Sequence, residues 1–340
     1  MSKTSHFLIG YLSPLAGVGV ALFVIFLLYR DLDFPQFFIE LKQAKLVWII
    51  ALALAILIEQ LIQGWKWRQL LYDLKPIAST RLTGAFFAGY CANCFVPLGV
   101  SPLVRSWLVA RLESLKMSSI LVTTIISRFV DGIVFGLLAL TLALIGNFPR
   151  IDGDLQTGIA VAGILNFIIF SIALWILFYS RTSLTNDKPV ISRAVDKLAL
   201  KCRGMLGDLR SGLVDGIIWP RQITRQLGIV TASVAMKIVS TTHFLWAGLA
   251  LGILLPPLDY LFVMVFAGFA LVLARFIRVP GGFVIGSGFA LKLLGVPDET
   301  AVAMILLTHV MALILVVSIG TFVLWRSGIS IRLLRTQELV

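Results

Sequence analysis

Charged and polar side chains inside long apolar stretches are the residues of this sequence that could do chemistry. A charge at membrane depth is costly unless it is paired, hydrated or bound to a ligand, so such residues mark substrate or ion sites. The candidates are Glu59, Asn93, Arg105, Arg128, Asp131, Lys237, Arg275, Arg278, Gly281, Gly282 and Ser287. Cations outnumber carboxylates in this set, which favours an anionic amphiphile over a metal ion or a sugar as the ligand.

Arg128 and Asp131 lie one helical turn apart in the apolar run 119–146. Side chains at this spacing share a helix face and can form an ion pair. An arginine at this depth also suits phosphate, because the planar guanidinium binds two phosphate oxygens at once. The spacing leaves a structural pair and a phosphate site both open.

Lys237 lies near the middle of the apolar run 226–250. From there its side chain cannot easily extend to water at either end of the helix. It therefore needs a carboxylate such as Glu59 or Asp131, or an anionic ligand. A site role is the interpretation we favour for this residue.

Two stretches rich in Pro and Gly, 97–102 and 280–288, break the apolar pattern. Asn93 and Arg105 flank the first break, and Arg275 and Arg278 precede the second. Backbone freed from helical pairing can bind a polar headgroup where it lines a wet cavity, and a following helix start favours an anion. A plain loop with a basic anchor is the alternative for the first break, and glycine-mediated helix packing for the second.

The segment Trp65-Lys66-Trp67-Arg68 follows Glu59, Gln60 and Gln63 in the run 47–64 and its continuation. Trp, Lys and Arg are enriched where helices leave the membrane. We therefore predict an interfacial belt at 65–68, with Glu59 deeper.

No metal or cofactor is expected. Cys91 and Cys94 lie in an apolar stretch without a second pair, and Cys202 is remote from both. The histidines are scattered along the chain, so packing cysteines are the favoured interpretation.

Composition identifies the elements that carry these residues as membrane helices. The chain is 59% hydrophobic and 14% charged, with a mean hydropathy of +0.98. Soluble domains carry roughly 25% charged residues, and helices are the simplest structure that satisfies backbone groups in lipid. The net charge of +12 is attributed to loops facing anionic headgroups rather than to nucleic-acid binding. Helices are predicted at about 8–29, 47–64, 119–146, 157–179, 226–250, 260–277, 284–295 and 301–326, with an interrupted apolar stretch at 83–98 and 103–112.

Loop charge predicts the orientation. Segment 180–225 holds nine basic and four acidic residues, so it is expected on the cytoplasmic side. Alternation then gives an all-α membrane domain over 1–340 with eight crossings, a re-entrant hairpin at 83–112 and both termini cytoplasmic. The predicted halves are 1–179 and 226–340, joined by the linker 180–225, whose apolar spacing over 191–213 predicts an amphipathic helix.

Several of these residues resemble one family. The order Trp67-Arg68, Asn93-x3-Pro97, Arg105, Arg128-x2-Asp131 and Val279-Pro280-Gly281-Gly282 is similar to the flippase-like membrane domain of lysylphosphatidylglycerol synthases and its stand-alone relatives. The resemblance implies a transporter that moves phospholipid or lipid-linked products between leaflets of a bacterial-type cytoplasmic (inner) membrane. Aminoacyl transfer belongs to a soluble domain outside this pattern, so we expect a transporter and not an enzyme.

The chain departs from the family pattern at four places. Ser101-Pro102 replaces an expected Gly-Glu or Gly-Asp, and Ser127 and Ser287 stand where the family usually has Glu. His309 stands at the position of a usual Arg. Loss of three carboxylates implies a more cationic cavity, and hence an anionic phospholipid or a polyprenyl-phosphate-linked lipid.

Two other functions stay open. One is an accessory subunit for a lipid-modifying enzyme. The other is a polyprenyl-phosphate-sugar-dependent glycosyltransferase, supported by Asp31-Leu32-Asp33, although a solvated turn explains this motif equally well. The expected partners are membrane lipids with anionic headgroups. A second copy of the chain or a lipid-modifying enzyme is left open as a protein partner, and nucleic acid is not expected.

Overall fold

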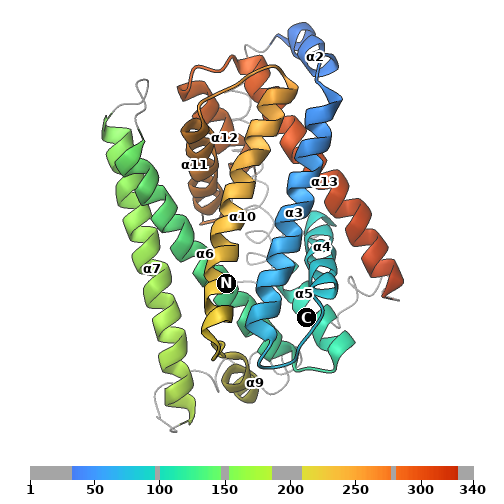
Figure 1. The fold of residues 1–340 in the computed structure, drawn as a ribbon, viewed down its shortest axis with the longest axis vertical. Coiled ribbons are helices and arrows are strands. Elements are labelled where there is room, and N and C mark those ends of the chain that lie inside the picture. Colours follow the sequence, from blue (N-terminus) through green and yellow to red (C-terminus); the bar gives the residue numbers. More distant parts are fainter. Residues whose placement is uncertain (1–32, 96–99, 147–152, 186–208, 277–280, 328–340) are drawn as a thin grey trace, which may run out of the picture. The chain divides into compact units, whose positions relative to one another are not determined.

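A computed structural model describes residues 33–95, 100–146, 153–185, 209–276 and 281–327, and every regular element in these ranges is a helix (Figure 1). The all-α fold class is thereby confirmed for the described residues. Predicted helix 8–29 lies outside them. The elements are α2 (Phe34–Lys42), α3 (Leu46–Leu71), α4 (Ser79–Phe95), α5 (Ser101–Glu113), α6 (Met117–Ile145), α7 (Gly153–Thr185), α9 (Leu209–Gly216), α10 (Ile223–Ala250), α11 (Pro257–Phe276), α12 (Gly282–Leu293) and α13 (Asp298–Arg326).

Six of the described helices are long and apolar enough to cross a membrane: α3, α6, α7, α10, α11 and α13. Large apolar side chains stay exposed along them, such as Ile169 and Trp175 on α7, at 60% and 65% exposure. A water-soluble fold buries such side chains, whereas lipid solvates them. The chain is therefore a multi-pass membrane protein.

The described residues contain six candidate spans, fewer than the eight predicted crossings. Helix α12 has 12 residues and rises about 18 Å at 1.5 Å per residue, which is short of the roughly 30 Å hydrocarbon core. The length of α12 therefore does not support the predicted crossing at 284–295, and the count of eight crossings stays a prediction. Helices α4 and α5 pack against each other and are also too short to count among the six candidate spans. Their re-entrant arrangement stays a prediction.

Contacts divide the chain into two compact units. Unit 1 comprises 1–55, 138–163 and 240–311, and unit 2 comprises 56–137, 164–239 and 312–340. Each unit draws on three separate segments of the chain. The predicted halves 1–179 and 226–340 follow the order of the sequence, and they stay a prediction.

The core of unit 2 forms around the end of α3 and the α4–α5 pair. Trp67, Leu71, Phe86 and Leu108 are almost completely buried there. The indole of Trp67 contacts the ring of Phe86 edge-on, with centroids 5.1 Å apart. The belt predicted at 65–68 is therefore wrong for its central residues, because α3 continues to Leu71 and turns them into the core.

The linker is described only in part. Helix α7 runs to Thr185, beyond the predicted end at 179, and α9 covers Leu209–Gly216. A Cβ on Gly216 would lie 2.6 Å from the Ser119 carbonyl oxygen, so this glycine lets α9 approach the start of α6. Most of the predicted amphipathic helix 191–213 lies outside the described residues.

In unit 1, the backbone N–H of Gln36 donates to the Asp33 carboxylate at 3.1 Å, so Asp33 is the N-cap of α2. Helix capping therefore accounts for Asp33 of the Asp31-Leu32-Asp33 motif without a catalytic role. Asp31 lies outside the described residues.

Candidate functional site

Unit 2 holds an ion pair between the Lys66 ammonium of α3 and the Asp131 carboxylate of α6. The two atoms are 2.5 Å apart, and the side chains are 0% and 19% exposed. Lys66 follows Glu59 and Gln63 at steps of seven and three residues, which places all three on one helix face. A lysine this buried persists only with a partner, so the pair anchors α3 to α6.

Arg105 of α5 lies beside this pair and is only 3% exposed. Its guanidinium carbon is 4.4 Å from the centre of the Phe86 ring and 5.6 Å from that of Trp67. The Trp67 indole N–H donates to the Thr123 hydroxyl at 3.0 Å, which fixes the ring that Arg105 faces. Aromatic rings stabilise a cation without occupying its N–H donors, and the Tyr90 side chain interacts with the same guanidinium.

Gly89 allows Arg105 to lie in the core. A Cβ on Gly89 of α4 would lie 2.8 Å from the Ser101 carbonyl oxygen and 3.3 Å from the Arg105 Cβ. Only a residue without a side chain lets α4 and α5 approach so closely. The break between the helices and Gly89 together bring Arg105 into the core.

Several buried polar atoms of α3, α4 and α5 have no hydrogen-bond partner among the described residues. They include the Arg105 Nε, the Asn93 Oδ1, the Ser101 Oγ and the Gln60 Oε1. Buried polar groups are normally satisfied, and exceptions mark sites that are completed by water or a ligand. A binding role for Asn93 and Arg105 stays a prediction.

Further cations lie close to these groups. Lys237 and Arg105 repel the Lys66 ammonium, and Arg128 repels Arg105 while Asp131 attracts it. The Lys237 ammonium is 5.4 Å from the centre of the Phe135 ring. We call Lys66, Arg105, Arg128 and Lys237, with Asp131, the cationic cluster. Its four cations exceed its carboxylates even if Glu59 is counted, so its field favours an anion.

Two members of the cluster lie at mid-helix depth. Asp131 is the fifteenth residue of the 29-residue α6, and Lys237 is the fifteenth of the 28-residue α10. Both lie at the midpoint of helices long enough to span. Substrate sites of membrane transporters commonly lie at this depth.

The sequence singled out Arg105, Arg128, Asp131 and Lys237 as candidates but not Lys66. Arg128 and Lys237 were the partners considered for Asp131, and the structure adds a contact between its carboxylate and Lys66. The error came from the Trp residues beside Lys66, which are typical of an interface. The face shared with Glu59 and Gln63 is the signal that could have identified it.

The remaining predicted residues belong to unit 1. Gly281 has φ of +81°, a conformation that glycine adopts without strain, and it begins α12. A Cβ on Gly282 would clash with Ala274 of α11, so close helix packing accounts for this glycine. The Ser287 hydroxyl donates to the Phe283 carbonyl oxygen, and the His309 ring stacks on Phe283 with centroids 6.0 Å apart.

A lipid role for these unit 1 residues stays a prediction. Arg275 is the second-last residue of α11 and only its backbone is described, while Arg278 lies outside the described residues. Their convergence with Arg105 and Arg128 is likewise a prediction.

No group of three His, Cys, Asp or Glu side chains that could hold a metal occurs among the described residues. Cys91 is buried, and its sulfur lies 3.6 Å from the Thr321 hydroxyl. Cys94 is exposed, and its thiol donates to the Tyr90 carbonyl oxygen at 3.4 Å. The sulfurs therefore make local contacts that do not require a metal.

At the end of α5, Glu113 joins two basic side chains. Its carboxylate lies 2.9 Å from the Lys75 ammonium and 2.7 Å from an Arg81 nitrogen. Hydrogen bonds from Lys75 and then Arg81 hold the pKa of Glu113 below its ordinary value. This ion-pair network ties the α3–α4 connection to α5.

Comparison with known proteins places this geometry in a family. A family model described as the lysylphosphatidylglycerol synthase TM region matches residues 15–320. Neither a search of curated proteins nor a search of solved structures finds a match. The matched range contains the cationic cluster and the α11–α12 pair, and it confirms the resemblance found in the motifs. The chain belongs to the family of the lysylphosphatidylglycerol synthase transmembrane region.

Proposed function

We propose that this protein is a lipid transporter that moves an anionic phospholipid or a polyprenyl-phosphate-linked lipid between bilayer leaflets. The cationic cluster of unit 2 is the observation that carries this proposal. Four cations gather around Asp131, and Lys66 and Arg105 are buried among apolar side chains. The family match supports a function related to membrane lipids.

Arg105 is the residue we assign to the headgroup phosphate. The Phe86 and Trp67 rings hold the guanidinium of Arg105 in place, and its Nε has no hydrogen-bond partner among the described residues. A phosphate can accept two parallel hydrogen bonds from such a group. The unsatisfied Asn93 oxygen near the same helix pair can accept from a headgroup hydroxyl or amine.

Lys66 and Asp131 have a different role in this proposal. Asp131 neutralises the buried lysine while no lipid is bound, so the site stays folded without its substrate. An arriving phosphate adds a negative charge where cations are in excess, so its binding lowers the repulsion between Lys66, Arg105 and Lys237. A zwitterionic headgroup brings its own cation and loses part of this gain.

Reconstitution of the purified chain alone tests the proposal. Liposomes receive a trace of fluorescent phosphatidylglycerol or fluorescent phosphatidylcholine, and a membrane-impermeant reductant bleaches the outer leaflet. Transport predicts that the reductant bleaches more than half of the phosphatidylglycerol label, and less of the phosphatidylcholine label. Bleaching equal to that of protein-free liposomes for every anionic lipid tested, including a polyprenyl phosphate, contradicts it.

A further inference from the structure

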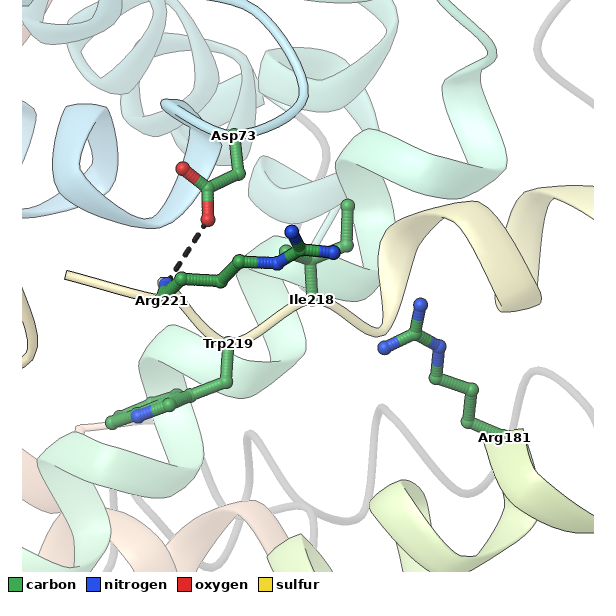
Figure 2. Close-up of a pocket in the computed structure, with 5 residues that line it drawn as sticks. All are labelled: Asp73, Arg181, Ile218, Trp219 and Arg221. Carbon is green, nitrogen blue, oxygen red and sulfur yellow. Dashed lines mark hydrogen bonds between the residues drawn. The ribbon is translucent and has the colours of Figure 1, made fainter.

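Unit 2 contains a second basic site, at the end of α3, and none of its residues belongs to the cationic cluster. A cavity of about 430 Å³ is lined by Asp73, Arg181, Ile218, Trp219 and Arg221. Figure 2 shows the side chains of Arg181, from α7, and Arg221, from the segment before α10, directed toward the space beside Ile218. We call these five residues the Arg181–Arg221 pocket. Sites for small ligands typically measure about 300–1,000 Å³.

The shape of the pocket is fixed by contacts at its base. The Arg221 backbone N–H donates to the Asp73 carboxylate at 3.1 Å, which ties the segment before α10 to the end of α3. Arg225 reinforces this link, because its guanidinium donates to the Gln69 side chain at 3.0 Å and stacks on Tyr72. Asp73 thus holds the backbone of this segment, and the two arginines and one aspartate of the pocket carry a net positive charge.

An apolar groove adjoins the pocket. Leu174, Phe178 and Trp219 line a second cavity of about 320 Å³, so Trp219 belongs to both cavities. Its indole contacts Phe178 edge-on at a centroid distance of 6.3 Å. Leu174, Phe178 and Trp219 are partly buried against the core of unit 2. Many other apolar side chains of α7, a candidate span, are exposed, so the groove borders the apolar surface of the membrane helix.

A charged cavity joined to an apolar groove fits a molecule with both characters. Free phosphate matches the guanidinium groups but leaves the groove unused. A phospholipid matches both, because its phosphate is anionic and its acyl chain is apolar. Trp219 lies where the two cavities meet. Trp side chains are enriched at the level of the lipid headgroups, where the acyl chains begin.

We infer that the Arg181–Arg221 pocket binds the phosphate of an anionic phospholipid from the adjacent leaflet, with an acyl chain along Leu174, Phe178 and Trp219. This site does not depend on transport by the cationic cluster. The bound lipid lies on the side of unit 2 that the basic linker predicts to be cytoplasmic.

Quenching of Trp219 by a brominated lipid tests this inference. The full chain, in neutral detergent micelles, is titrated with phosphatidylglycerol carrying bromines on its acyl chains, which quench nearby indoles. The chain has eight Trp residues, so the signal of Trp219 is the difference between the wild type and Trp219→Phe. We expect saturable quenching of this signal. Half-saturation should require about tenfold more lipid after Arg181→Ala with Arg221→Ala, because charge-assisted contacts are lost.

Arg326→Ala is the matched control, since Arg326 is an exposed arginine in the last turn of α13 in the same unit. It should leave the titration unchanged. Equal quenching by brominated phosphatidylcholine, or quenching that survives loss of both arginines, overturns the inference. Displacement of the lipid by equimolar inorganic phosphate assigns the pocket to a soluble anion and also overturns it.

The salt dependence of the wild type covers the case in which the double variant does not fold. Exposed guanidinium groups are screened by salt, whereas apolar contacts are not. Binding of phosphatidylglycerol should therefore weaken as sodium chloride is raised. Binding that is independent of salt contradicts a phosphate contact in this pocket.

Discussion

Replacing Asp131 with Asn should destabilise the protein much more than replacing Lys66 with Met, although the two side chains form one ion pair. Removal of Asp131 leaves the buried Lys66 ammonium beside Arg105 and Lys237, which repel it. Removal of Lys66 leaves the Asp131 carboxylate in the field of Arg105, which attracts it. The asymmetry follows from the excess of cations in the cluster.

The magnitude follows from the burial of the pair. An uncompensated buried charge costs about 3–5 kcal/mol, and this range applies to Asp131→Asn because Lys66 is 0% exposed. Lys66→Met removes a hydrogen bond from a carboxylate that keeps other cations nearby, at a cost of about 1 kcal/mol. The double variant removes both charges and should cost about as much as Lys66→Met alone.

Thermal unfolding of the detergent-solubilised protein, followed by size-exclusion chromatography of the heated samples, measures these differences. At about 2–4 °C per kcal/mol, Asp131→Asn should lower the Tm by roughly 10 °C and Lys66→Met by a few degrees. The matched control is the pair Lys116–Asp215, with side chains 53% and 46% exposed and 2.9 Å apart. The same substitutions there should shift the Tm by about 2 °C or less, because exposed pairs contribute little.

Two results would refute the reasoning. An equal decrease in Tm for the two single variants would mean that the neighbouring cations do not act on the ion pair. A double variant as unstable as Asp131→Asn would mean that Asp131 stabilises α6 by a contact other than Lys66.

Further predictions concern three other residues of unit 2. Arg128→Lys should lose most of the transport of phosphatidylglycerol without loss of Tm, because lysine keeps the charge but not the bidentate geometry; full transport would remove Arg128 from the site. Lys237→Met should reduce transport and keep or raise the Tm, and unchanged transport with less folded protein would make Lys237 structural. Because Lys75 and Arg81 lower the pKa of Glu113, the stability from this network is present above the ordinary carboxyl pKa and is lost as the pH falls through the lowered value. The Tm difference between wild type and Glu113→Gln should therefore shrink on acidification; a difference that is constant with pH contradicts the network.

Most helices could be predicted from the sequence because apolar length is a strong signal in membranes. The predicted runs 119–146 and 226–250 correspond to α6 (Met117–Ile145) and α10 (Ile223–Ala250). The predicted run 284–295 is as long as α12, 12 residues in both cases. It was counted as a crossing because the alternation of loops between the two sides of the membrane required one at this place.

The site was predicted in part because single charges are conspicuous in apolar runs. Arg105, Asp131 and Lys237 stood out in this way. Lys66 did not, since flanking Trp residues gave it the pattern of an interface, and its burial depends on tertiary pairing with Asp131 of α6. The Arg181–Arg221 pocket was also missed, because its residues come from three separate segments and carry no common spacing.

Headgroup selectivity of transport in liposomes tests the central claim most directly, which is that the cationic cluster recognises an anionic lipid. Phosphatidylglycerol and phosphatidylcholine are compared in wild type, in Arg105→Gln and in Arg111→Gln, whose exposed arginine lies on the same helix α5. The wild type and Arg111→Gln should prefer phosphatidylglycerol, and Arg105→Gln should lose the preference by about tenfold while it still elutes as a folded protein. An unchanged preference in folded Arg105→Gln would contradict the claim.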